Sequence, residues 1–172
     1  MPTISKKGHN IPSSPIRKLV PYADKAKQNG IDILHLNIGQ PDIKSPIESI
    51  DAIKNIDIEL LKYEYSQGSH KFRKNLCSYY SGHNINVSPD DIITTVGASE
   101  ALSFTMTSIC DPGDEVIIPE PFYANYNGFA QASDVKVIPV TSKIEDNFAL
   151  PSIELFEKKI NNDIIKIDAL IK

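Results

Sequence analysis

The stretch Asp91–Tyr126, which reads DIITTVGASEALSFTMTSICDPGDEVIIPEPFYANY, decides the fold. Its opening residues, Ile92–Val96, are rich in β-branched side chains and predict a short strand buried on both faces. Gly97-Ala98-Ser99 then turns the chain. Behind this turn, small and apolar residues recur at the spacing of one helix face: Ala98, Ala101, Leu102, Thr105, Met106 and Ile109.

A second strand is expected after this helix. Asp111–Asp114 has the composition of a turn, and Glu115–Ile118 has that of a buried strand. Pro119 and Pro121 are expected to end the strand, because proline cannot donate to a ladder. The order of strand, tight turn, helix and strand predicts a βαβ unit and places the protein in the α/β class.

The small-residue turn Gly97-Ala98-Ser99 is the candidate binding element. The first amides of a helix lack partners within it, and the helix dipole adds partial positive charge there. With the Ser99 hydroxyl, these amides would form a cradle for a phosphate group. The alternative is structural: Gly97 makes the turn and Ser99 caps the helix.

Five motifs in order resemble those of the fold-type I pyridoxal-phosphate enzymes, and among these the class I/II aminotransferases. The resemblance runs from about Pro15 to the end of the chain. The motifs are Leu36–Asp42, Tyr63–Arg73, Gly97–Leu102, Asp111–Val116 and Pro119–Tyr126.

The resemblance implies the fold and its divisions. The chain would be an incomplete N-terminal part of the aminotransferase large domain, a three-layer α/β/α structure with a mostly parallel sheet, preceded by an N-terminal arm and helices. Residues 1–45 would form the arm and the substrate-loop segment, and residues 46–172 a partial pyridoxal-phosphate-binding domain. In the family, Ile92–Val96 lies at one edge of a seven-stranded sheet, and its neighbouring strands come from downstream sequence.

The resemblance also implies roles for individual residues. Gly97, Ala98 and Ser99 would bind the phosphate of pyridoxal 5'-phosphate. The Tyr123 ring would stack on the pyridine ring, where the alternative is plain packing on the core.

Two more residues come from other motifs. Tyr63, with Tyr65 as the alternative, would bind the cofactor phosphate of the other subunit in a homodimer. The Gly39 amide would help to hold the substrate carboxylate, although the Gly39 segment also reads as a plain turn. Arg73 is expected to be a structural ion-pair partner.

The implied activity is transfer of an amino group between an amino acid and a 2-oxo acid. The Schiff-base lysine, the acidic partner of the pyridinium nitrogen and the carboxylate-binding arginine all lie downstream in the family. We therefore name no catalytic residue and expect this chain alone, as a fragment, to be inactive. The alternatives are a lyase or synthase of the same fold, a non-catalytic truncated remnant, or an unrelated nucleotide-binding module.

Composition excludes other classes of function. The net charge of −4 over 172 residues gives no reason to expect nucleic acid or an anionic membrane as a partner. No apolar run is long enough for a membrane span or a signal peptide. Cys77 and Cys110 have neither metal-ligand spacing nor the pattern of a disulfide framework, so we expect no metal and a cytoplasmic location.

Further elements follow from periodicity. Residues 1–14 are expected to be an unpacked arm, and Phe72, Leu76, Tyr79 and Tyr80 predict a helix. Another helix is expected to begin at Pro121. Val135–Val140 and Asp163–Ile171 are expected to be strands.

Overall fold

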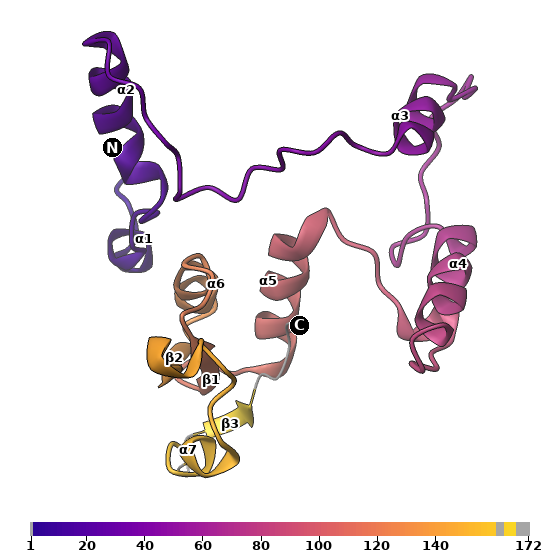
Figure 1. Ribbon diagram of the computed structural model, residues 1–172. Helices are drawn as coiled ribbons and strands as arrows, with labels where there is room; N and C mark the ends of the chain where they lie inside the picture. Colours follow the sequence, from indigo (N-terminus) through magenta and orange to yellow (C-terminus); the bar gives the residue numbers. More distant parts are fainter. Residues whose placement is uncertain (1, 161–163, 168–172) are drawn as a thin grey trace. The chain divides into compact units, whose positions relative to one another are not determined.

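The computed structural model describes residues 2–160 and 164–167. The chain divides into two compact units (Figure 1). Unit 1 contains residues 1–33 and 97–172, and unit 2 contains residues 34–96.

A parallel sheet lies at the centre of unit 1. Its strands are β1 (Glu115–Glu120), β2 (Lys136–Thr141) and β3 (Ile164–Ile167), in the spatial order β2-β1-β3. The predicted strand at 135–140 is confirmed. The prediction for 163–171 is confirmed over β3, and the rest of it lies outside the described residues.

Helices cover both faces of this sheet. Helix α6 (Tyr126–Ala132) connects β1 to β2, and α7 (Ile153–Glu157) lies between β2 and β3, after a 3-10 turn η3 (Ile144–Asp146). The connection from β1 to β2 and the connection from β2 to β3 cross the sheet in opposite directions. Because connections between parallel strands are right-handed, their helices lie on opposite faces of the sheet. Figure 1 shows α6 and α7 on opposite sides of the strands, with α5 (Gly97–Ile109) on the side of α6. This is the three-layer arrangement of an α/β domain.

The core forms where α5 and α6 pack on β1. Met106 of α5 and Tyr126 of α6 lie in one buried cluster with Val116 and Ile118, which alternate onto the same face of β1. Leu102 and Cys110, one helical turn to either side of Met106, pack against this cluster. The predicted apolar face of α5 is therefore the face that the sheet buries.

Two sequence predictions about the ends of elements are wrong. β1 does not end before Pro119 but includes it, and the strand stops at Glu120, where a cis peptide bond leads to Pro121. Pro119 is tolerated because β3 pairs only with residues 115–117 of β1 in the described chain. The following helix begins at Tyr126 and not at Pro121, so Tyr123 lies in the connecting turn.

Residues 1–14 are more ordered than predicted, because they contain α1 (Lys6–Asn10). A 3-10 turn η1 (Arg17–Leu19) and α2 (Val20–Gln28) follow. The Lys7 amine forms an ion pair with Asp134 and donates to the Ala132 carbonyl at 3.3 Å, at the end of α6. The predicted loose arm is therefore attached to unit 1 at this point.

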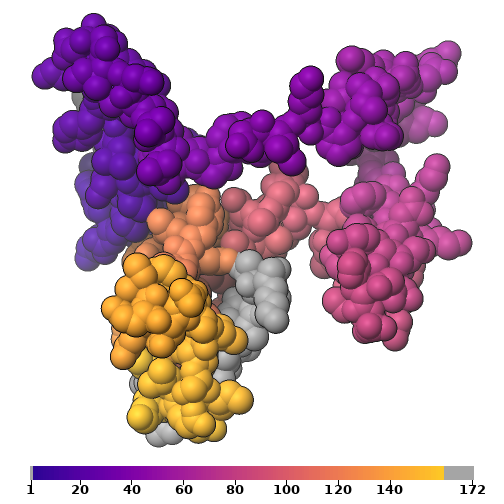
Figure 2. Space-filling view, viewed as in Figure 1, coloured from indigo at the N-terminus to yellow at the C-terminus, as the bar shows by residue number. Residues whose placement is uncertain are grey.

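Unit 2 has little buried apolar surface. It contains α3 (Ile47–Lys54), α4 (His70–Ser81) and a 3-10 turn η2 (Pro89–Asp91). Within residues 34–96, all of which the structure describes, Arg73 is the one buried residue. The space-filling view shows the segment before α3 as a thin, extended stretch of chain (Figure 2). Within this segment, the Leu36 side chain is 93% exposed.

The predicted strand at Ile92–Val96 is wrong for this structure. The segment is extended but belongs to no strand of the described chain, and Val96 is 88% exposed. A β-branched run becomes a strand only when another strand pairs with it, and the described sheet ends at β2 and β3. The prediction that both faces of Ile92–Val96 are buried is therefore wrong as well.

Candidate functional site

Gly97 begins α5, as the sequence predicts. Its φ of 77° lies in the left-handed region, which favours glycine, and a Cβ added there would meet no atom within 4 Å. Gly97, Ala98 and Ser99 are all exposed. The backbone of this turn is thus open to a ligand, and the first amides of a helix have no acceptors inside the helix.

The order of elements predicts that this turn lies at the carboxyl edge of the sheet. α5 has 13 residues and spans about 20 Å at about 1.5 Å per residue. β1 has six residues and spans about 20 Å at about 3.3 Å per residue. Because α5 packs on β1 through Met106 and a short turn joins them, we expect the start of α5 to lie near the end of β1. Ligands of open α/β sheets bind at this edge.

Tyr123 lies three residues after the carboxyl end of β1. Its ring is 51% exposed and makes an edge contact with Tyr126, with centroids 6.1 Å apart and planes at 82°. Its hydroxyl oxygen accepts a hydrogen bond from Asn125 Nδ2 at 2.6 Å. Both contacts restrain the ring and leave half of it available for stacking.

Gly39 and Tyr63 belong to unit 2, whereas Gly97 belongs to unit 1. Gly39 is exposed in the extended run before α3, and a Cβ added to it would meet no atom within 4 Å. The Tyr63 side chain is fully exposed, and Tyr65 is 71% exposed. Their predicted binding roles stay predictions.

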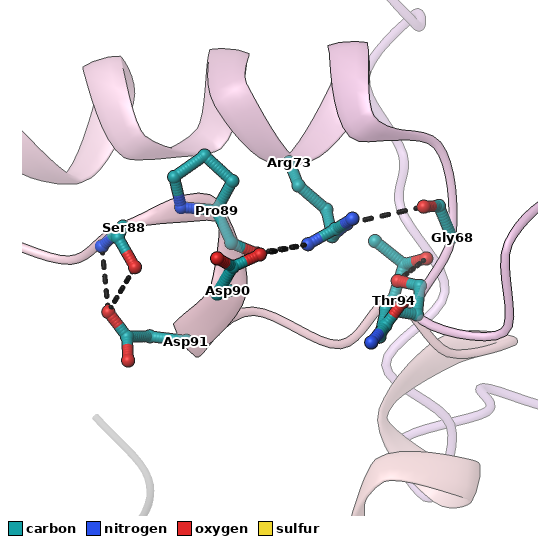
Figure 3. A network of polar contacts seen from close by, with 8 residues as sticks. Gly68, Arg73, Ser88, Pro89, Asp90, Asp91 and Thr94 are labelled. Carbon is teal, nitrogen blue, oxygen red and sulfur yellow. Dashed lines mark hydrogen bonds and ion pairs between the residues drawn. The ribbon is translucent and has the colours of Figure 1, made fainter.

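Arg73 is the centre of a polar network in unit 2 (Figure 3). Its Nε donates to the Gly68 carbonyl at 3.2 Å, and its Nη1 donates to the Pro89 carbonyl. Nη1 also lies 3.7 Å from Asp90 Oδ1, so the expected ion pair exists. The two carbonyl contacts could not be predicted from sequence.

Nearby side chains rigidify this network. The amide and the hydroxyl of Ser88 both donate to Asp91 Oδ2, at 2.8 and 2.7 Å. These bonds favour the charged carboxylate and hold the pKa of Asp91 below its ordinary value, the Ser88 hydroxyl being the main cause. In unit 1, the Ser152 hydroxyl likewise lowers the pKa of Glu154.

A surface hollow in unit 1 does not coincide with the predicted site. It encloses about 510 Å³ between Pro12, α6 and the start of β2, and its lining includes Asn127, Asp134 and Lys136. None of the predicted site residues lines it.

In the part of the chain that the structure describes, no helix has the length and apolar character needed to cross a membrane.

Comparison with known proteins identifies the family. The family model for aminotransferase class I and II matches residues 31–167. The chain belongs to this family.

Individual relatives agree with this result. An aspartate aminotransferase of Pinus pinaster is 31% identical over 82% of this chain, and a probable aspartate aminotransferase of Methanocaldococcus jannaschii is 31% identical over 98%. The structure of an alanine aminotransferase from Pyrococcus furiosus superimposes with a TM-score of 0.84, at 28% identity over 96% of this chain. The chain spans 29%, 42% and 43% of the lengths of these three proteins.

Proposed function

We propose that the chain is the N-terminal, cofactor-binding part of an aminotransferase that uses pyridoxal 5'-phosphate. The reaction is transfer of an amino group between an amino acid and a 2-oxo acid. The observation that carries this proposal is the open Gly97 turn at the start of α5, in a chain that belongs to the aminotransferase family. In this proposal residues 1–45 are the arm and substrate loop, and residues 46–172 begin the large domain.

The phosphate of the cofactor is bound by the turn. The amides of Ala98 and Ser99 donate to its oxygens, and the Ser99 hydroxyl adds a third donor. The dipole of the 13-residue helix α5 favours negative charge at this end. The absence of a Cβ at Gly97 allows the phosphate to approach the backbone closely.

The ring of the cofactor is held by Tyr123. The half-exposed face of this tyrosine offers an offset stack, which contributes about 0.5–1.5 kcal/mol beyond burial. The contacts to Tyr126 and Asn125 keep the ring in one orientation before the cofactor binds. Stacking therefore loses little side-chain freedom.

Two residues of unit 2 have proposed roles of their own. The Gly39 amide donates to the substrate carboxylate. Tyr63 donates its hydroxyl to the phosphate bound by the partner subunit of a homodimer, a role that suits a side chain exposed on its own chain. When bound, the cofactor supplies the electron sink for amino-group transfer, and the lysine that attaches it is expected from sequence downstream of this chain.

We place this enzyme in the cytoplasm. Two cysteines, Cys77 and Cys110, do not make a disulfide framework in a chain of this size, and such frameworks are typical of secreted proteins.

The proposal is tested by activity and by cofactor affinity. The enzyme that contains this chain is expected to transfer the amino group of an amino acid to a 2-oxo acid, and failure with every donor would contradict the proposal. Ser99→Ala removes a donor to a charged group, so the affinity for pyridoxal phosphate is expected to fall by about 10- to 100-fold. The control is Ser108→Ala, an exposed serine at the other end of α5. Equal affinities of the two variants would show that the phosphate is bound elsewhere.

A further inference from the structure

We propose that Arg73 is a positioning residue that sets the pose of the loop carrying Tyr63. The inference rests on the proposed function, because Tyr63 matters only if it binds the cofactor phosphate. It goes further by assigning a role to a residue that touches neither cofactor nor substrate.

The loop needs an anchor outside its own side chains. Tyr63 is fully exposed, and residues 57–65 form neither helix nor strand. The position of the Tyr63 side chain is therefore decided by where the backbone is held. The first firm attachment after Tyr63 is the turn that ends at Gly68.

Several hydrogen bonds hold that turn. The Gly68 amide donates to the Tyr65 carbonyl at 2.8 Å. The Gln67 carbonyl accepts from both the amide and the hydroxyl of Thr94, at 3.0 and 3.1 Å. The Gly68 carbonyl accepts from Arg73 Nε. Consecutive carbonyls of the turn are thus tied to the Thr94 segment and to α4.

Arg73 joins this turn to a second rigid point. Its Nη1 donates to the Pro89 carbonyl of η2, and the bonds between Ser88 and Asp91 keep η2 in shape. The Arg73 side chain is buried, whereas its ionic partner Asp90 is 96% exposed. A surface ion pair of this kind contributes little, so the carbonyl contacts are the main attachments.

The geometry requires arginine. A guanidinium presents donors in a fixed fork, so Nε and Nη1 can reach two carbonyls in different directions at once. A lysine at this position keeps the positive charge but has one nitrogen, which cannot span both acceptors. Arg73→Lys therefore separates the anchoring function from the charge.

The test is a double-mutant cycle in the enzyme that contains this chain. Tyr63→Phe removes one hydrogen bond to the phosphate and is expected to lower the affinity for pyridoxal phosphate by about tenfold. Arg73→Lys is expected to lower this affinity by a similar factor. In a variant that already carries Tyr63→Phe, it is expected to lower the affinity little further. Lys74→Met, an exposed neighbour on α4, is the control and is expected to leave the affinity unchanged.

Hydrogen exchange provides an independent readout. In Arg73→Lys the amides of Gly68 and Thr94 are expected to exchange at least about tenfold faster, while amides in the second half of α4 keep their protection. Arg73→Met, which also removes the charge, is expected to show the same local change if the carbonyl contacts dominate. If the Arg73→Met variant unfolds, the exchange rates measured in Arg73→Lys test the proposal without it.

Three results would overturn the proposal. One is that Arg73→Lys lowers the affinity for pyridoxal phosphate by the same factor in the Tyr63→Phe variant as in the enzyme with Tyr63. This result would indicate a general structural role for Arg73. Another is that the amides of Gly68 and Thr94 exchange in Arg73→Lys at the same rate as in the unmodified enzyme. The last is an unchanged affinity of Tyr63→Phe while Ser99→Ala still weakens binding, which removes the role of Tyr63 but leaves the proposed function standing.

Discussion

At the scale of single residues, backbone conformation and close contact decide which positions are restricted. Gly68 has a φ of 89°, and a Cβ added there would lie 1.6 Å from Thr94 Oγ1. Gly128 of α6 has no such constraint, since a Cβ added there would meet no atom within 4 Å. These two glycines therefore predict opposite effects of the same substitution.

Gly68→Ala is expected to lower the free energy of unfolding by more than about 1 kcal/mol, because it strains the backbone and displaces Thr94. Gly128→Ala is the matched control and is expected to raise it by about 0.5–1 kcal/mol, since alanine favours the helix. Denaturant unfolding of both variants of the enzyme measures the difference. A neutral Gly68→Ala would show that the turn at Gly68 is not rigid.

A second prediction concerns the pKa of Asp91. Ser88→Ala removes the hydroxyl that is the main cause of its lowered pKa, so the pKa is expected to rise toward the ordinary value of 3.8. Because the folded pKa is depressed, the bonds between Ser88 and Asp91 stabilise the fold above the unfolded pKa. That contribution is lost as the pH falls through the folded pKa. Carboxyl chemical shifts followed against pH would test this, and an unchanged midpoint in Ser88→Ala would contradict it.

At the scale of elements, the open edge of β2 is the informative feature. Lys136 and Ser142 donate their amides to Asp114 and Glu120 on the β1 side. Because successive residues of a strand alternate, the backbone of Pro139 faces the open edge, where it has no amide to offer. Proline at such a position protects an edge strand from pairing with another chain.

Pro139→Thr is therefore expected to increase self-association, because it adds an unpaired amide and a residue that favours strands. Light scattering during prolonged incubation would measure this. The control is Val137→Thr, which has the same orientation in β2 but already carries an amide. Equal rates of association in the two variants would show that the missing amide does not protect the edge.

At the scale of the whole molecule, several large apolar side chains are exposed to solvent. Leu34, Leu61 and Val96 are each more than 80% exposed, and unit 2 buries no apolar residue. Exposed apolar surface favours association with other protein surfaces.

The 172-residue polypeptide produced alone is accordingly expected to form oligomers or aggregates and to show no amino-group transfer. Size-exclusion chromatography and an assay with an amino acid and a 2-oxo acid would test both statements. Elution as a monomer with a cooperative thermal transition would contradict the first. Measurable transfer would contradict the second.

The sequence alone determined the helix that begins at Gly97, the strand that follows it and the family. These follow from local patterns: β-branched runs, helical spacing and small residues at a helix start. Pairing and long-range contact, however, were decided only in the tertiary structure. Ile92–Val96 has the composition of a strand but belongs to no strand of the described sheet, because a strand requires a neighbour that no local pattern supplies. The acceptors of Arg73 are backbone carbonyls, which every residue carries alike, so only folding could select Gly68 and Pro89.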